Sequence, residues 1–86
     1  MEKNNNYEST DLMRLIQTKF TRLSKGQKLI ADYILNNYDK AAFMTASKLG
    51  EAVGVSESTV VRFATELGFS GYPKLQKSLH ELIKTK

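Results

Sequence analysis

The chain contains no cysteine and only one histidine, His80, among its 86 residues. Without cysteine there are no disulfide bonds and no thiolate metal ligands, so the core has to form by helix packing alone. A lone histidine beside one carboxylate, Glu81, supplies neither a catalytic constellation nor the ligand cluster that zinc requires. The sequence therefore favours neither an enzyme nor a metalloprotein, and we expect no cofactor and a solvated His80.

Long apolar runs are also missing. None approaches the roughly 20 residues needed to span a bilayer, and the polar N-terminus has no signal-peptide pattern. With 41% hydrophobic residues, the chain is long enough for one small domain. The net charge of +4 is spread evenly, and it is compatible with a nucleic-acid partner without requiring one. We expect a single domain in the cytoplasm, with no membrane partner.

Apolar periodicity predicts an all-α fold, a small bundle of about five helices. Residues 1–9 lack this periodicity and are expected to form a flexible lead-in, with the domain covering residues 10–86. The first helix is predicted to begin near Thr10. Its apolar stripe consists of Leu12, Leu15, Ile16 and Phe20.

A second helix is predicted to start after Ser24, which forms a capping-box pattern with Gln27, and to end near Asn37. Asp39 is placed to cap a short third helix that ends near Met44. These segments are expected to support the rest of the domain.

Two short amphipathic segments flank a tight turn between Thr45 and Thr65, in TASKLGEAVGVSESTVVRFAT. Gly54 suits a backbone with positive φ, and Ser56 can cap the next helix through the N–H of Ser58 or Thr59. This pattern predicts a helix-turn-helix, a motif whose second helix enters the DNA major groove. The residues predicted to form the turn and core of this motif are Leu49, Gly50, Val53, Gly54, Val55, Val60 and Phe63. The alternative is a helical hairpin that packs only against its own core.

The last helix is predicted to start between Ser70 and Lys74, because proline is tolerated in a first turn. Gly68 is expected to end the preceding helix, and Phe69 to fold back over it. The apolar face continues almost to Lys86, which suggests that the natural polypeptide continues.

The segment from Leu23 to Leu75, and above all TVVRFATELGFSGYPKL, resembles the N-terminal DNA-binding domain of the RpiR family of bacterial transcriptional regulators. SKGQKLIADYILNN is similar to that family's first long helix, and AFMTASKLGEAVGVS to its entry into the motif. Gly50 departs from the alanine expected there. The most specific positions are Val60, Val61, Arg62, Phe63, Leu67, Gly68, Phe69, Gly71 and Tyr72.

This resemblance implies a regulator of sugar or phosphosugar metabolism that acts as a transcription factor. RpiR-type regulators carry a C-terminal sugar isomerase-like domain that binds a phosphosugar and alters the DNA affinity of the N-terminal domain. That domain is absent from this chain. We therefore expect a fragment that binds double-stranded DNA, forms a homodimer in its parent protein, and does not sense the effector by itself.

The residues expected to read DNA bases lie on the second motif helix or cap it. They are Ser56, Glu57, Ser58, Thr59, Val61, Arg62 and Thr65. Arg62 can donate two parallel hydrogen bonds to guanine, and Val61 can meet a thymine methyl group. Two alternatives remain open: Arg62 pairs with Glu66 in solvent, and Glu57 serves only the positive end of the helix.

The residues expected to contact phosphates lie near helix starts or carry point charges. They are Thr45, Lys48, Ser70, Gly71, Tyr72, Lys74 and Lys77. The Tyr72 ring packing on the core is an equally good interpretation. For the whole chain, the alternative function is a helical protein-interaction or dimerisation module that uses the stripe of the first helix.

Overall fold

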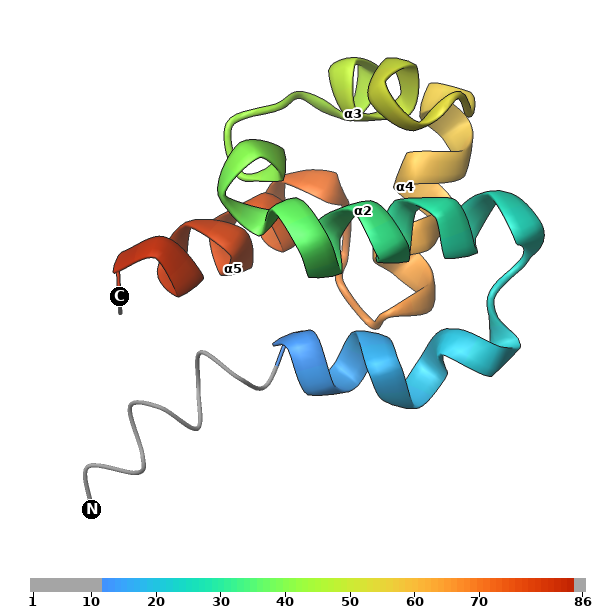
Figure 1. Ribbon diagram of the computed structural model, residues 1–86, viewed down its shortest axis with the longest axis horizontal. Helices are drawn as coiled ribbons and strands as arrows, with labels where there is room; N and C mark the ends of the chain where they lie inside the picture. The colour runs from blue at the N-terminus through green and yellow to red at the C-terminus, as the bar shows by residue number, and fades with distance from the viewer. Residues whose placement is uncertain (1–11, 85–86) are drawn as a thin grey trace.

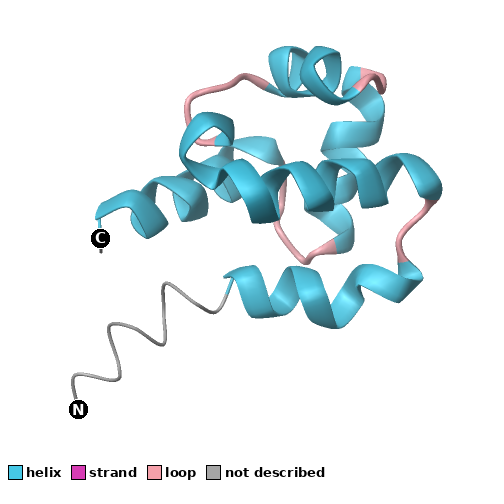
Figure 2. Cartoon of the chain, viewed as in Figure 1, coloured by secondary structure: helices cyan, strands magenta, loops and turns pink. Residues whose placement is uncertain are grey.

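The computed structural model describes residues 12–84, and these residues form helices joined by short loops, with no strand among them (Figures 1 and 2). Residues 12–19 are helical and run into a 3₁₀ turn, η1, at Phe20–Arg22. The remaining elements are α2 (Lys25–Ala41), α3 (Ala46–Val53), α4 (Glu57–Glu66) and α5 (Tyr72–Lys84). The predicted all-α bundle is therefore confirmed.

In Figure 1, α2 crosses the middle of the molecule, with α3 above it and residues 12–19 below it. Helices α2 and α4 each contact the other three labelled α-helices. One hydrophobic core lies between the helices, and its largest fully buried side chains come from all five of them: Ile16, Ile30, Ile34, Leu49, Val60, Phe63, Leu75 and Leu79.

The N-terminal stripe belongs mostly to this core. Leu12 and Ile16 are buried, whereas Leu15 and Phe20 are half-buried and pack against it. The predicted helix start near Thr10 and the lead-in 1–9 lie outside the described residues. The stripe thus stabilises the domain itself, with only part of its area left for another molecule.

The capping box of α2 is present as predicted. Ser24 Oγ accepts a hydrogen bond from the N–H of Gln27, and Gln27 Oε1 accepts one from the N–H of Ser24. The far end of the helix differs in part from the prediction. The backbone leaves helical geometry at Asn37 (φ −143°, ψ 45°), where the second helix was predicted to end, but it resumes and α2 continues to Ala41. The short third helix predicted to end near Met44 is therefore the last part of α2, after this kink, and it ends at Ala41. Within residues 12–84, Asp39 accepts only from the adjacent N–H of Lys40, so it does not cap a separate helix as predicted.

The turn of the motif has the predicted geometry. Gly54 ends α3 with φ 83° and ψ 32°, in the left-handed region where an L-residue would be strained. The N–H groups of Gly54 and Val55 both donate to the carbonyl of Gly50, at 2.8 and 2.9 Å. Ser56 then caps α4 by accepting from the N–H of Thr59, one of the two predicted donors.

The small size of Gly50 has a local reason. A Cβ at this position would lie 2.7 Å from the carbonyl oxygen of Val55, which is closer than real Cβ contacts. The tight approach therefore involves the backbone of the turn at Val55 and Ser56. Leu49, Val60 and Phe63 are fully buried as predicted, and Val53 and Val55 are half-buried against the core.

Helix α5 begins at Tyr72, inside the predicted interval, with Pro73 in its first turn. Gly68 has φ 100°, and the N–H of Phe69 donates to the carbonyl of Ala64 at 3.0 Å. Phe69 therefore folds back over the end of α4, as the sequence predicted. Its half-buried ring packs against the core.

Candidate nucleic-acid interface

The outer face of α4 is a solvent-exposed surface on a rigidly packed helix. Val60, Phe63 and Ala64 point into the core, so the opposite side of the helix faces outward. The exposed residues on that side are Glu57, Ser58, Val61, Arg62 and Thr65. Five of the seven predicted base-reading residues are thus brought together on one face.

The outer face of α4 is slightly concave. Glu57, Ser58, Val61 and Arg62 line a shallow hollow of about 420 Å³ at the N-terminal half of the helix. Val61 is 40% exposed, although it is a large apolar side chain. An aliphatic group beside a guanidinium and a hydroxyl is the mixture that contacts base edges in a major groove.

The remaining two predicted readers, Ser56 and Thr59, are engaged with each other. Their hydroxyl groups share a hydrogen bond of 2.9 Å, and Ser56 Oγ also accepts from the N–H of Thr59 at 3.2 Å. Thr59 is only half-buried at the edge of α4, where it meets α2. These two residues lie beside the outer face, and the hydrogen bonds between them cap the start of α4.

Arg62 is exposed, and residues 12–84 contain no ion pair between it and Glu66. The guanidinium is therefore available to a ligand. The hydroxyl group of Thr65, in contrast, donates to the carbonyl of Val61 at 3.2 Å. Glu57 is exposed in the first turn of α4, where its charge also suits the positive end of the helix.

At the start of α3, Thr45 Oγ1 accepts from the N–H of Lys48 at 3.1 Å. Lys48 Nζ lies 3.8 Å from Glu51 Oε1, and the two side chains are 72% and 71% exposed. Such an exposed pair contributes little, so a phosphate can replace the carboxylate. Both predicted phosphate contacts at this helix are accessible.

At the start of α5, Ser70, Lys74 and Lys77 are exposed and Gly71 is half-buried, which leaves their polar groups near the surface. Tyr72 differs from them. Its side chain is buried, and its hydroxyl donates to the carbonyl of Met44 at 2.7 Å. Burial raises the pKa of Tyr72 to about 12. Its hydroxyl is therefore occupied by the protein, and a phosphate contact at Tyr72 depends on its backbone N–H.

Sequence reasoning missed a second residue at this junction. Gln76 Nε2 donates to the carbonyls of Ala42 and Met44, at 3.1 and 3.0 Å. Gln76 follows Tyr72 by one helical turn, so both side chains reach the loop between α2 and α3. They tie the first turns of α5 to the loop that leads into α3.

Nothing in the described part of the chain resembles a catalytic or metal centre. Residues 12–84 contain no group of three or more His, Cys, Asp and Glu side chains able to hold a metal ion. His80, which was expected to be solvated, is half-buried, with its ring centroid 5.4 Å from that of Phe43. No helix among these residues has the length and apolar character needed to traverse a bilayer.

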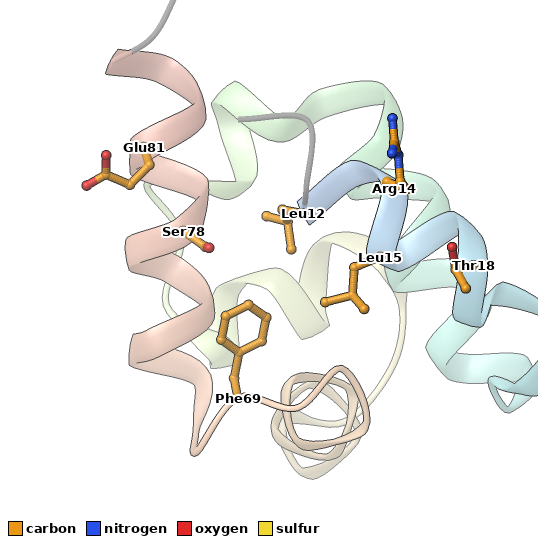
Figure 3. Close-up of a pocket in the computed structure, with 7 residues that line it drawn as sticks. All are labelled: Leu12, Arg14, Leu15, Thr18, Phe69, Ser78 and Glu81. Atoms are coloured by element: carbon orange, nitrogen blue, oxygen red, sulfur yellow. The ribbon is translucent and has the colours of Figure 1, made fainter. Parts of the chain in front are cut away.

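A second hollow, of about 570 Å³, lies between residues 12–19, the loop after α4, and α5 (Figure 3). Leu12, Leu15 and Phe69 point into the same space, and Glu81 points away from it. Among residues 12–84, Arg14 is the only basic residue that lines it. This mostly apolar surface does not suit a phosphate backbone.

A compact trihelical arrangement of α2, α3 and α4 with an exposed second motif helix defines a helix-turn-helix domain, which is a DNA-binding class without enzymatic activity. The chain matches the helix-turn-helix domain of the rpiR family over residues 10–86. It belongs to this family, as the resemblance in its sequence predicted.

Individual relatives are also similar to the chain, and all three named below are HTH-type transcriptional regulators. The chain is 37% identical over 68 residues to the uncharacterized HTH-type transcriptional regulator YfhH of Escherichia coli (strain K12), covering 79% of this chain and 24% of the relative. It is 38% identical over 73 residues to the HTH-type transcriptional regulator HexR of Pseudomonas aeruginosa, covering 85% and 26%. For the HTH-type transcriptional regulator GlvR of Bacillus subtilis (strain 168), the identity is 34% over 65 residues, covering 76% and 26%. The chain thus spans about a quarter of the length of these relatives.

Proposed function

We propose that this domain binds specific sequences of double-stranded DNA by placing the N-terminal half of α4 in the major groove. The observation that carries the proposal is the outer face of α4, where Ser58, Val61 and Arg62 are exposed on a helix whose other face is locked in the core. An α-helix fits the width of the major groove, and residues near its N-terminus contact base edges in helix-turn-helix proteins.

In this complex, Arg62 reads guanine through two N–H donors and Val61 meets a thymine methyl group. Ser58 is placed to contact a base edge or a phosphate. The phosphate contacts come from the starts of α3 and α5, with Thr45, Lys48, Ser70 and Gly71 near the backbone and Lys74 and Lys77 as point charges. These contacts set the orientation of α4 and carry no sequence information directly.

We further propose that the domain is the DNA-binding part of a longer bacterial regulator acting in the cytoplasm as a homodimer. Two-fold symmetry is common in such regulators, because two recognition helices then meet two half-sites. The resemblance to the RpiR family supports a role in sugar or phosphosugar metabolism. The effector would bind outside this chain, in a sugar isomerase-like domain.

A second candidate function rests on the apolar hollow in Figure 3. Leu15 and Phe69, which are half-buried, could bury further area against another protein there, and this is the interaction module that the sequence left open. The dependence of affinity on salt concentration distinguishes DNA binding from protein interaction. DNA affinity falls steeply with salt concentration because bound lysines and arginines release counterions from the phosphates, and apolar association lacks this dependence.

Selection of binding sites from random duplexes, using this domain as the bait, tests the primary proposal. We expect one enriched half-site and an affinity that falls as salt rises. Recovery of no enriched sequence, together with salt-insensitive retention of DNA, would overturn sequence-specific binding.

A further inference from the structure

The edge of α4 that carries Arg62 is covered at one point by the start of α2. Thr59 and Arg62 are three residues apart, so their side chains are separated by about 60° around the helix. Arg62 is exposed, and Thr59 is the half-buried neighbour on the side toward α2. The segment that packs against Thr59 from the side of α2 therefore borders the proposed DNA-reading face.

Gly26, the second residue of α2, lies directly against this edge. A Cβ on Gly26 would be 3.3 Å from Thr59 Cγ2 and 3.5 Å from Val55 Cγ1. The missing side chain lets the backbone of α2 approach the start of α4. The residues next to Gly26 are consequently held at a fixed position beside α4, on a helix whose capping box is complete.

Two lysines of α2 lie close to this contact, and they have different surroundings. Lys28 Nζ lies 5.6 Å from the ring centroid of Phe20, a cation–π distance that holds the ammonium group against η1. Lys25 immediately precedes Gly26 and is exposed. Its ammonium group has no ion-pair, hydrogen-bond or ring partner among residues 12–84. Of these two lysines, Lys25 is therefore the one whose ammonium group is free to bind a ligand beside α4.

A helix of about 10–12 Å diameter fills a major groove of about 12 Å width, so the two phosphate backbones run along its flanks. One flank lies toward Thr59 and α2. We propose that Lys25 contacts a DNA phosphate at this flank, and so adds a basic contact from α2 to those expected from α3 and α5. This inference rests on the proposed function, because it requires α4 to enter the groove.

The test compares salt dependence in matched variants. Binding to a duplex of random sequence is measured at several salt concentrations for the unmodified domain, Lys25→Ala, Lys25→Arg and Lys40→Ala. Lys40 is exposed at the other end of α2, so its replacement removes the same charge from the same helix. Thermal melting of each variant confirms that it is folded, because neither lysine belongs to the core.

We expect Lys25→Ala to reduce the slope of log affinity against log salt by about 0.9, which corresponds to one phosphate contact. Lys25→Arg should keep the slope, and Lys40→Ala should leave it unchanged. An unmodified domain that binds DNA together with a Lys25→Ala slope equal to that of Lys40→Ala would overturn the role of Lys25 alone. If the unmodified domain binds no duplex, the proposed function fails and this inference fails with it.

Discussion

Tyr72 and Met44 are 28 residues apart, and a hydrogen bond of 2.7 Å from the tyrosine hydroxyl to the methionine carbonyl joins them. Met44 precedes Thr45, the cap of α3, and Tyr72 is the first residue of α5. Through this bond, the last helix fixes the point where the helix-turn-helix begins. The same carbonyl also accepts from Gln76, so two side chains of α5 share one acceptor.

Replacing Tyr72 with phenylalanine tests how much this bond contributes to stability. We expect Tyr72→Phe to lower the free energy of unfolding by about 0.5 to 1.5 kcal/mol, because Gln76 still satisfies the carbonyl of Met44. Tyr33→Phe is the control, since Tyr33 is half-buried and its hydroxyl makes no hydrogen bond to any other of residues 12–84. Equal losses in urea or thermal unfolding for the two variants would contradict the assigned role.

The raised pKa of Tyr72 predicts a dependence of stability on alkaline pH. The pKa is about 12 in the folded domain and 10.0 for an unperturbed tyrosine, so the unfolded chain loses this proton first. The stabilisation is fully present below pH 10 and is lost as the pH rises toward 12. Unfolding measured across this range should therefore show a steeper decline for the unmodified domain than for Tyr72→Phe. Parallel pH profiles would argue against a buried, protonated hydroxyl.

Gly54 should resist replacement because its backbone is left-handed. Gly54→Val is expected to cost about 1 to 2 kcal/mol or more, since a β-branched residue strongly disfavours positive φ. Apart from its two chain neighbours, no described residue has a heavy atom within 4 Å of a Cβ at this position, so the cost comes from the backbone conformation and not from a steric clash. Gly54→Asn should be milder, because asparagine tolerates this region. Ala52→Val, at an exposed position of α3, controls for the valine itself, and melting temperatures compare the three variants.

Variants of Arg62 and Lys74 should distinguish a residue that reads bases from one that only binds phosphates. Arg62→Ala is expected to cost about 1 to 3 kcal/mol on the preferred duplex and to relax selectivity there. Lys74→Ala should weaken all duplexes alike and reduce the salt slope by about one. Titrations of specific and scrambled duplexes at several salt concentrations measure both effects. If Arg62→Ala weakens the two duplexes equally, Arg62 is an anchor and does not read bases.

Local signals in the sequence were enough to predict the helices and the turn. The caps at Ser24 and Ser56 and the left-handed Gly54 depend on residues within a few positions of one another, so the chain itself indicates them. The membership in the rpiR family followed from residues of the same region.

The features that sequence reasoning missed depend on contacts between distant segments. The partner of Tyr72 is set by how α5 lies on the loop after α2, and no spacing rule indicates a separation of 28 residues. The edge position of Thr59 likewise follows from the approach of Gly26. His80 was expected in solvent because the sequence around it does not indicate its neighbour Phe43, which lies in the loop after α2.

Helix α4 has a fixed and modest length. It contains 10 residues between the cap at Ser56 and the turn before Gly68, so it is about 15 Å long. A full turn of B-DNA extends over about 34 Å. One copy of this helix therefore reaches only a few base pairs before the groove curves away, and the information content of a site read by a single domain is small. If the domain acts as the proposed homodimer, the spacing between two such short half-sites would supply most of the discrimination among similar DNA sequences.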